Sequence, residues 1–309
     1  MIGQKWMLFT VAEALSKTLT KSLQKAAGVV STTLAHAFFA TLLVGLVQVV
    51  VGYIMARKQG HKIIDTPQNI LGACLFGFFA LVITVLGFGT FVYNGDIGVS
   101  VFLITLSIVP GAIFDRIFFK HSINIRQWTG VILGIFAGYV ILGMPSLKEI
   151  ANFPVWVWMS LGIALMLAVN QAITQKIQKI DPFVKNFWGG IVQLIFGGIG
   201  VIILGSDFFS GISRGNLIAL SVISTLVGIV AVFMWMFNLM AYQRGGAIAL
   251  KNLVMNGSYL VTAMVAGIIF FGEPSSAEKS MGAGLYIVAF ALFDPSTWRT
   301  LSSMRLHRA

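Results

Sequence analysis

Residues 118–134 read FFKHSINIRQWTGVILG, and residues 270–286, which lie 152 positions later, read FFGEPSSAEKSMGAGLY. The two stretches align without a gap, and in both an apolar helix end is followed by a polar loop. A glycine, Gly130 in the first stretch and Gly282 in the second, then opens the next apolar segment. This correspondence predicts that the chain contains two related halves.

The first apolar segment of the chain also has a counterpart, at a shift of 154 residues. Its polar positions match polar positions of the later segment: Ser16, Lys17, Thr20, Lys21 and Gln24 align with Asn170, Gln171, Thr174, Gln175 and Gln178. In both segments they recur at i, i+1, i+4, i+5 and i+8, which is one face of an α-helix. The difference between the two shifts is what a small insertion would produce.

The composition is typical of a chain embedded in lipid. Hydrophobic residues make up 57% of the sequence and charged residues 10%, and the mean hydropathy is +0.90, whereas a soluble domain carries roughly 25% charged residues. Ten apolar runs are separated by brief connections: 6–23, 32–56, 69–92, 97–119, 127–144, 154–177, 183–205, 215–241, 246–271 and 280–295. Because lipid does not tolerate unpaired strands, we expect an all-α membrane protein with ten transmembrane helices.

The loop charges predict the orientation of these helices. If the N-terminus is cytoplasmic, fourteen Lys and Arg residues lie on the cytoplasmic side and four (Lys25, Lys148, Arg214 and Lys279) on the other, which places both termini in the cytoplasm. Each half, 1–148 and 149–309, then holds five helices, and an odd number makes the halves inverted copies. Inverted repeats are a known transporter architecture, with the substrate site near the membrane midplane.

These features together resemble the drug/metabolite transporter superfamily, specifically its ten-helix members with two EamA-type repeats. The resemblance rests on the five-plus-five pattern, on Pro110 in the fourth span, on the FFGEP at 270–274 and on the glycines that open the fifth and tenth spans. It implies export of amino acids, other metabolites or drugs through a cavity between the repeats. The first half departs from the pattern, with Lys120-His121 where the second has Gly272-Glu273.

The first span is also similar to the first helix of the small multidrug resistance proteins, which have an Ala-Glu pair followed by Thr-Leu-x-Lys. Here these are Ala12-Glu13 and residues 18–21. The resemblance implies that Glu13 couples transport to protons.

The polar face of the first span contains the leading candidate site residues. Counted from Trp6 at 1.5 Å per residue, Glu13 lies roughly 10 Å deep and Lys17 roughly 16 Å deep. Because charges at that depth are costly, the face must line a cavity or a protein interior. Glu13 and Lys17 either bind substrate and protons or form a structural i,i+4 ion pair. We expect Lys21, nearer the outer surface, to extend toward the interface.

Other spans contribute further candidates. By repeat symmetry Asn170, Gln171 and Thr174 face the same centre, where they either bind substrate or make interhelical contacts. The ninth span carries a second polar face. Its members Lys251, Asn252, Asn256 and Tyr259 either reach the substrate or, for Lys251, extend to the cytoplasmic surface. Trp235 in the eighth span either lines the cavity or is a packing or interfacial anchor residue.

We therefore expect a secondary transporter in the plasma or inner membrane that exports small polar or amphipathic, amino-acid-like metabolites by proton-coupled or exchange alternating access. The alternatives are a multidrug cation/proton antiporter and a lipid-carrier flippase. The lone cysteine (Cys74) and the single histidine at membrane depth (His36) disfavour a membrane-embedded enzyme. We expect no cofactor, no metal and no nucleic acid, and a monomer or homodimer in the bilayer with a small molecule as substrate.

Overall fold

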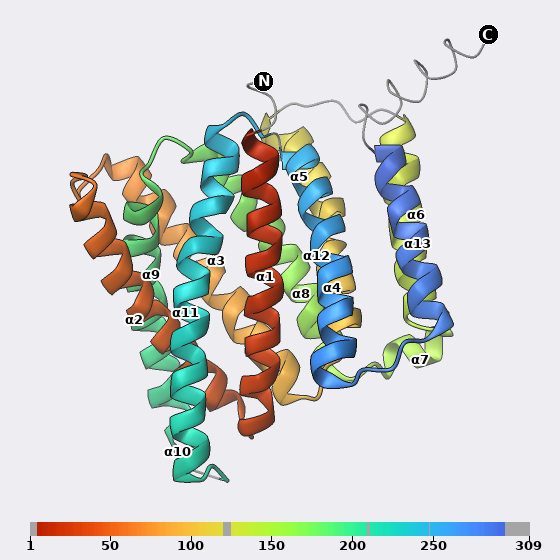
Figure 1. The fold of residues 1–309 in the computed structure, drawn as a ribbon, viewed down its shortest axis with the longest axis horizontal. Helices are drawn as coiled ribbons and strands as arrows, with labels where there is room; N and C mark the ends of the chain where they lie inside the picture. Colours follow the sequence, from red (N-terminus) through yellow and green to blue (C-terminus); the bar gives the residue numbers. More distant parts are fainter. Residues whose placement is uncertain (1–4, 120–124, 209–210, 247, 294–309) are drawn as a thin grey trace.

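The computed structural model describes residues 5–119, 125–208, 211–246 and 248–293, and in these ranges it contains helices and no strands. The helices are α1 Lys5–Val30, α2 Leu34–Lys58, α3 Pro67–Val92, α4 Ile97–Thr105, α5 Ile108–Phe119, α6 Ile125–Ile141, α7 Leu147–Ala151, α8 Val155–Lys176, α9 Pro182–Ile203, α10 Gly205–Phe208, α11 Arg214–Gln243, α12 Ile248–Phe271 and α13 Ala277–Phe293. The long helices run side by side, and the short α7 and α10 lie at the lower ends of these helices (Figure 1).

Seven helical segments in the described ranges are long and apolar enough to cross a bilayer. They are Leu34–Lys58, Pro67–Val92, Ile97–Phe118, Val155–Lys176, Pro182–Ile203, Arg214–Gln243 and Val254–Phe271. The sequence predicts ten spans. The other three coincide with α1, which carries Glu13, Lys17 and Lys21, and with α6 and α13, which have 17 residues each. The chain is thus an α-helical protein with the apolar helices of a membrane protein.

The first helix has its polar side inward and its apolar side outward. Glu13 on α1 is fully buried, whereas Leu8 is 71% exposed and Leu19 is 50% exposed. A soluble protein has the opposite arrangement, because its surface must face water. The outer face of α1 is therefore suited to lipid and its inner face lines a polar interior.

Glycines let helices α2 and α9 approach each other closely. A Cβ atom added to Gly190 on α9 would lie 2.9 Å from the carbonyl oxygen of Gly45 on α2. Between these glycines the Gln193 side chain donates a 2.7 Å hydrogen bond to the Oε1 atom of Gln48, and both side chains are buried. Small residues that allow backbones to touch, with a polar pair between them, are characteristic of helix packing in membranes.

The fourth predicted span, 97–119, is interrupted in the structure. Helix α4 ends at Thr105, five residues before Pro110, and α5 begins at Ile108, two residues before it. Proline has no N–H to donate to the carbonyl one turn earlier, so the helix breaks just before it. The carbonyl of Thr105 accepts hydrogen bonds from Asn256 Nδ2 at 3.2 Å and from the Tyr286 hydroxyl at 3.4 Å.

The helices pack in a small number of close pairs. Helix α1 packs against α11, α3 against α8, and α2 against α9. Helices α6 and α13 pack mainly against each other and form one end of the molecule (Figure 1). The polar face of α1 consequently faces the centre of the bundle, where α3, α11 and α12 surround it.

Candidate functional site

A buried ion cluster centred on Glu13 lies inside the bundle. Lys17, one turn later on α1, places its Nζ atom 2.9 Å from Glu13 Oε1, and Lys251 of α12 places its Nζ atom 2.6 Å from Oε2. Asn238 of α11 donates a 2.9 Å hydrogen bond to Oε1. The cluster thus joins three helices, and neither Glu13 nor Lys251 has any exposed side-chain surface.

More lysines than Glu13 can neutralise are buried in this region. Lys185 of α9 is fully buried, donates to the Trp235 carbonyl at 3.2 Å, and lies 4.1 Å from the centre of the Phe76 ring. It interacts electrostatically with both Glu13 and Lys251. Lys21 is buried as well, so the described part of the bundle interior contains four buried lysines and one buried glutamate, Glu13.

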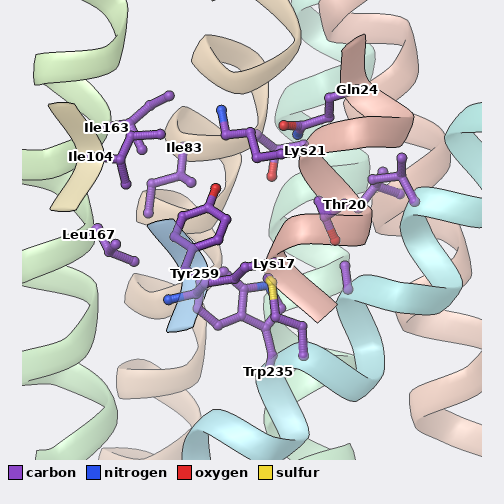
Figure 2. Close-up of a pocket in the computed structure, with 15 residues that line it drawn as sticks. Lys17, Thr20, Lys21, Gln24, Ile83, Ile104, Ile163, Leu167, Trp235 and Tyr259 are labelled. Carbon is purple, nitrogen blue, oxygen red and sulfur yellow. The ribbon is translucent and has the colours of Figure 1, made fainter. Parts of the chain in front are cut away.

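A small pocket with a cavity volume of about 60 Å³ borders the cluster. Its polar side belongs to α1, and the other lining residues are mostly apolar (Figure 2). The lining consists of Lys17, Thr20, Lys21, Gln24, Val44, Ile83, Thr84, Ile104, Ile163, Leu167, Val227, Ala231, Met234, Trp235 and Tyr259. Lys17 belongs to both the cluster and the pocket, so a ligand in the pocket would lie next to the ions.

The structure brings five of the ten candidate residues to this region. Glu13, Lys17 and Lys251 form the cluster, and Lys17, Trp235 and Tyr259 line the pocket. Whether they bind a substrate stays a prediction.

Three other candidates have hydrogen bonds to the backbone. Asn170 donates to the Phe76 carbonyl at 3.0 Å, Thr174 donates to the carbonyl one turn earlier in its own helix, and Asn256 donates to Thr105. Such bonds to the backbone are structural contacts, the alternative to substrate binding that the sequence leaves open for these residues. Gln171 is fully buried, and both of its amide atoms lack a hydrogen-bond partner in the described part of the chain. The side chain of Asn252 lies outside the described residues.

Two lysines lie elsewhere than the sequence predicts. Lys21, expected to extend toward the interface, is only 6% exposed and lines the pocket, because its side of α1 faces α3. Lys185 is one of the fourteen cations that the sequence places on the cytoplasmic side, but it lies in the first turn of α9 and is fully buried. The signal available for Lys185 was its apolar setting in PFVKNFW, residues 182–188.

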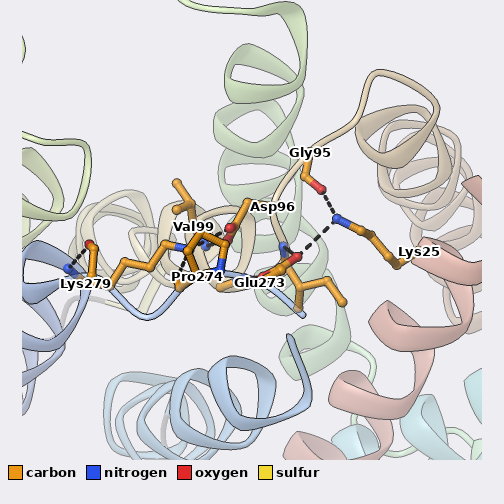
Figure 3. Close-up of polar contacts among 10 residues, drawn as sticks. Lys25, Gly95, Asp96, Val99, Glu273, Pro274 and Lys279 are labelled. Carbon is orange, nitrogen blue, oxygen red and sulfur yellow. Dashed lines mark hydrogen bonds and ion pairs between the residues drawn. The ribbon is translucent and has the colours of Figure 1, made fainter. Parts of the chain in front are cut away.

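A second ionic network joins loops at one end of the bundle (Figure 3). Lys25, at the end of α1, pairs with Glu273 at 3.1 Å and donates to the Gly95 carbonyl at 2.7 Å. Glu273 also accepts from the backbone N–H groups that open α4, at 2.6 Å from Ile97 and 3.2 Å from Gly98. Glu273 of the FFGEP stretch thereby links the end of α12 to α1 and α4.

The same network continues across the loop before α13. Lys279 pairs with Asp96 at 2.6 Å, and Asp96 in turn caps α4 by accepting from the Val99 N–H at 2.8 Å. These pairs place Lys25 and Lys279, two of the four cations assigned to one side of the membrane, at the same end of the molecule (Figure 3).

Comparison with known proteins gives a fold and no activity. No family model and no curated protein matches the chain. Twenty-eight chains of solved structures match it. One, described only as "Crystal structure of protein", has a TM-score of 0.65 at 11% identity and covers 96% of this chain and 99% of its own. At that identity the match shows a shared fold over nearly the whole chain.

Proposed function

We propose that the chain is a secondary transporter of the drug/metabolite type that moves a small metabolite with an acidic group by alternating access. The observation that carries the proposal is the buried cluster of Glu13, Lys17 and Lys251 at the edge of a pocket inside the bundle. Ionisable groups at membrane depth are expensive to maintain and belong, as a rule, to substrate or ion pathways.

We further propose that ten helices cross the membrane as two inverted five-helix repeats, with both termini in the cytoplasm. Residues 45–52 read GLVQVVVG and residues 190–197 read GIVQLIFG, a shift of 145. These two segments pack against each other in a reciprocal way. A Cβ atom on Gly45 would meet the backbone of Gln193 and Leu194, and one on Gly190 would meet Gln48 and Val49. Such reciprocity is expected of equivalent helices related by a two-fold axis.

The wider packing supports the same symmetry. If α1 is equivalent to α8 and α3 to α11, then the α1–α11 contact and the α8–α3 contact are two copies of one interface. The α2–α11 and α9–α3 contacts form a second such pair, and α2–α9 and α6–α13 are each their own counterpart. The pocket lies where the two halves meet, as in other transporters with inverted repeats.

Alternating access requires a closure that can open, and the Lys25–Glu273 network is suited to this role. Lys25 follows the pocket residue Lys21 by one helical turn, so the network lies beyond the pocket on one side. It joins α1, the loop before α4 and the loop after α12 with a few ionic bonds and partial exposure. Opening that end would break these bonds while leaving the Glu13 cluster in place.

Glu13 is the coupling residue in this scheme. Protonation of its carboxylate removes the negative charge that holds Lys17 and Lys251, and these cations then need another anion. Proton binding and binding of an acidic substrate therefore favour each other, and this reciprocity is the requirement for coupled transport. A cationic drug would instead meet Lys17 and Lys21 on the pocket wall, which argues against the multidrug cation antiporter.

The test is uptake into proteoliposomes with a panel of metabolites, with and without an imposed pH gradient. We expect the gradient to drive accumulation by the wild type and not by Glu13→Gln. The matched control is Glu149→Gln, which makes the same substitution at an exposed glutamate. Hydrogen bonds from the Ser146 side chain and backbone hold the pKa of Glu149 below its ordinary value. Equal responses of wild type and Glu13→Gln to the gradient would refute coupling through Glu13. Absence of uptake or exchange of every panel member would refute the transporter.

A further inference from the structure

Lys21 is a buried cation for which the described residues supply no anion. Its side chain is 6% exposed, and its Nζ atom has no hydrogen-bond partner in the described part of the chain. Its Nζ atom lies over the Phe91 ring, 5.1 Å from the ring centre. A ring face offers weaker stabilisation than a carboxylate, so this amine is poorly compensated for a group removed from water.

The lysine lies on the wall of the pocket, and its side chain extends along that wall (Figure 2). Lys17, one turn away on the same helix face, also lines the pocket. No Asp or Glu is among the lining residues that the structure describes. A ligand ammonium would therefore find no ionic partner there, whereas a ligand anion would find Lys21, with Lys17, the partner of Glu13, one helical turn away.

The wall across from α1 is apolar. Ile83, Ile163 and Leu167, from α3 and α8, face the lysines, and the aromatic side chains of Trp235 and Tyr259 close the lower side (Figure 2). A fully charged ligand with polar groups throughout would lose hydration against these side chains without compensation. A ligand with one charged end and an apolar body matches both walls.

We propose that the pocket binds a small organic carboxylate with an apolar body, whose carboxylate pairs with Lys21 and whose body packs against the isoleucine and leucine wall. That the bound molecule is also transported rests on the proposed function. The inference narrows the substrate to a carboxylate without an amino group. Lys17 remains paired with Glu13 and becomes a second partner of the carboxylate when Glu13 is protonated.

The test is direct binding of three probes of similar shape to the purified full-length protein in detergent. Phenylacetate is the anion, phenylacetamide the neutral isostere and 2-phenylethylamine the cation. We expect phenylacetate to bind more than about tenfold tighter than either of the others, because a hydrogen bond to a charged partner in a buried site has at least that effect. Lys21→Met should lose this preference, Lys21→Arg should retain it, and the exposed Lys148→Met should match the wild type.

Lys21→Met also distinguishes a binding residue from a structural one. Replacement of a buried, uncompensated cation by an apolar side chain of similar length should leave the protein as stable as the wild type or more stable, measured by thermal unfolding without ligand. A lysine that only holds the fold together would give the opposite result. Weak binding by a less stable Lys21→Met protein therefore counts against the proposal.

The other outcomes are equally decisive. Equal binding of phenylacetate and phenylacetamide, preference for the amine, unchanged phenylacetate binding by Lys21→Met, or no binding of any probe to folded wild type overturns the carboxylate site. Selective phenylacetate binding without exchange of labelled phenylacetate in proteoliposomes keeps the site and refutes its use in transport. Exchange of other metabolites without phenylacetate binding keeps the transporter and refutes the carboxylate.

Discussion

Replacement of Glu13 by Gln should destabilise the protein more than any other conservative change on α1. The substitution keeps the shape of the side chain and still allows a hydrogen bond with Asn238, but it removes the only negative charge of the cluster. Lys17 and Lys251, at 2.9 and 2.6 Å from the carboxylate oxygens, would then remain buried without a counter-charge.

The magnitude follows from these distances. At an effective dielectric constant of 20, each ion pair contributes roughly 6 kcal/mol of Coulomb attraction. Most of this is offset in the intact protein by the desolvation of the ions, so the pairs add little net stability. Removing one partner of a buried pair leaves the desolvation cost uncompensated, and the expected loss is about 3–5 kcal/mol.

A second substitution makes the argument sharper. Lys251→Met in the Glu13→Gln background removes one of the two uncompensated cations and replaces it with an apolar chain. The double variant should therefore be more stable than Glu13→Gln alone by about 1–3 kcal/mol, although it carries one more change. Loss of packing alone would make the double variant less stable than the single one.

The assay is reversible unfolding in mixed micelles with increasing denaturing detergent, followed by circular dichroism, with Lys148→Met as the control for a change in charge at an exposed site. Two results would refute the reasoning. The first is a loss below about 0.5 kcal/mol for Glu13→Gln, which is the range of ordinary surface substitutions. The second is a double variant that is less stable than Glu13→Gln.

Two further predictions concern the Lys25–Glu273 network and the packing of α2 against α9. The first uses Gln24→Cys in a Cys74→Ala background as a reporter, labelled by a water-soluble thiol reagent. Glu273→Gln should raise the labelling rate by about tenfold or more, because a charged hydrogen bond that holds the closed state is lost. An unchanged rate would exclude a gate at this end. Gly190→Ala should abolish stable folding, since its Cβ would lie 2.9 Å from backbone atoms of α2, while Gly198→Ala, 3.5 Å from a side-chain methyl group, should be tolerated. Equal yields of folded protein for the two variants, measured by size-exclusion chromatography, would contradict the close α2–α9 approach.

The orientation of the first helix could be predicted from the sequence, because it depends on local periodicity. Glu13, Lys17 and Gln24 recur on one face of a helix, and charged groups at membrane depth must face inward. The structure confirms that all three are buried. Lys21 belongs to the same face and is buried as well, so the prediction that it extends toward the interface, which rests on its depth alone, is wrong.

The ion partners of Glu13 could be predicted only in part. The i,i+4 spacing places Lys17 beside Glu13, and the contact exists at 2.9 Å. The shorter contact is with Lys251, which is 238 residues away in the sequence, and no local pattern predicts which helix lies across from α1. Lys185 was missed for a similar reason, since a lysine in the first turn of a helix is ordinarily at the membrane surface.

The role of Asn256 shows how an irregular backbone takes up polar side chains. The sequence places this residue on a polar face and offers substrate contact, yet its amide donates to the carbonyl of Thr105. In a continuous helix the Val109 N–H would donate to that carbonyl, but it donates to the Leu106 carbonyl at 3.0 Å instead. An unsatisfied carbonyl in a membrane interior is costly, so the Asn256 amide stabilises the break. Predicting the bond would have required knowing that the fourth and ninth spans are neighbours.

The two proposed repeats share their packing and differ in the charges that their first helices carry. Under the shift of 154 residues, Glu13, Lys17 and Lys21 on α1 correspond to Leu167, Gln171 and Gln175 on α8. The equivalent face of α8 therefore has polar amides and no ions. A symmetric scaffold places both faces at the bundle centre, and only the face from the first half supplies a carboxylate that a proton can neutralise. The proposed coupling therefore depends on α1. In a Glu13→Gln protein, a second substitution Leu167→Glu on α8 should not restore the response to the pH gradient.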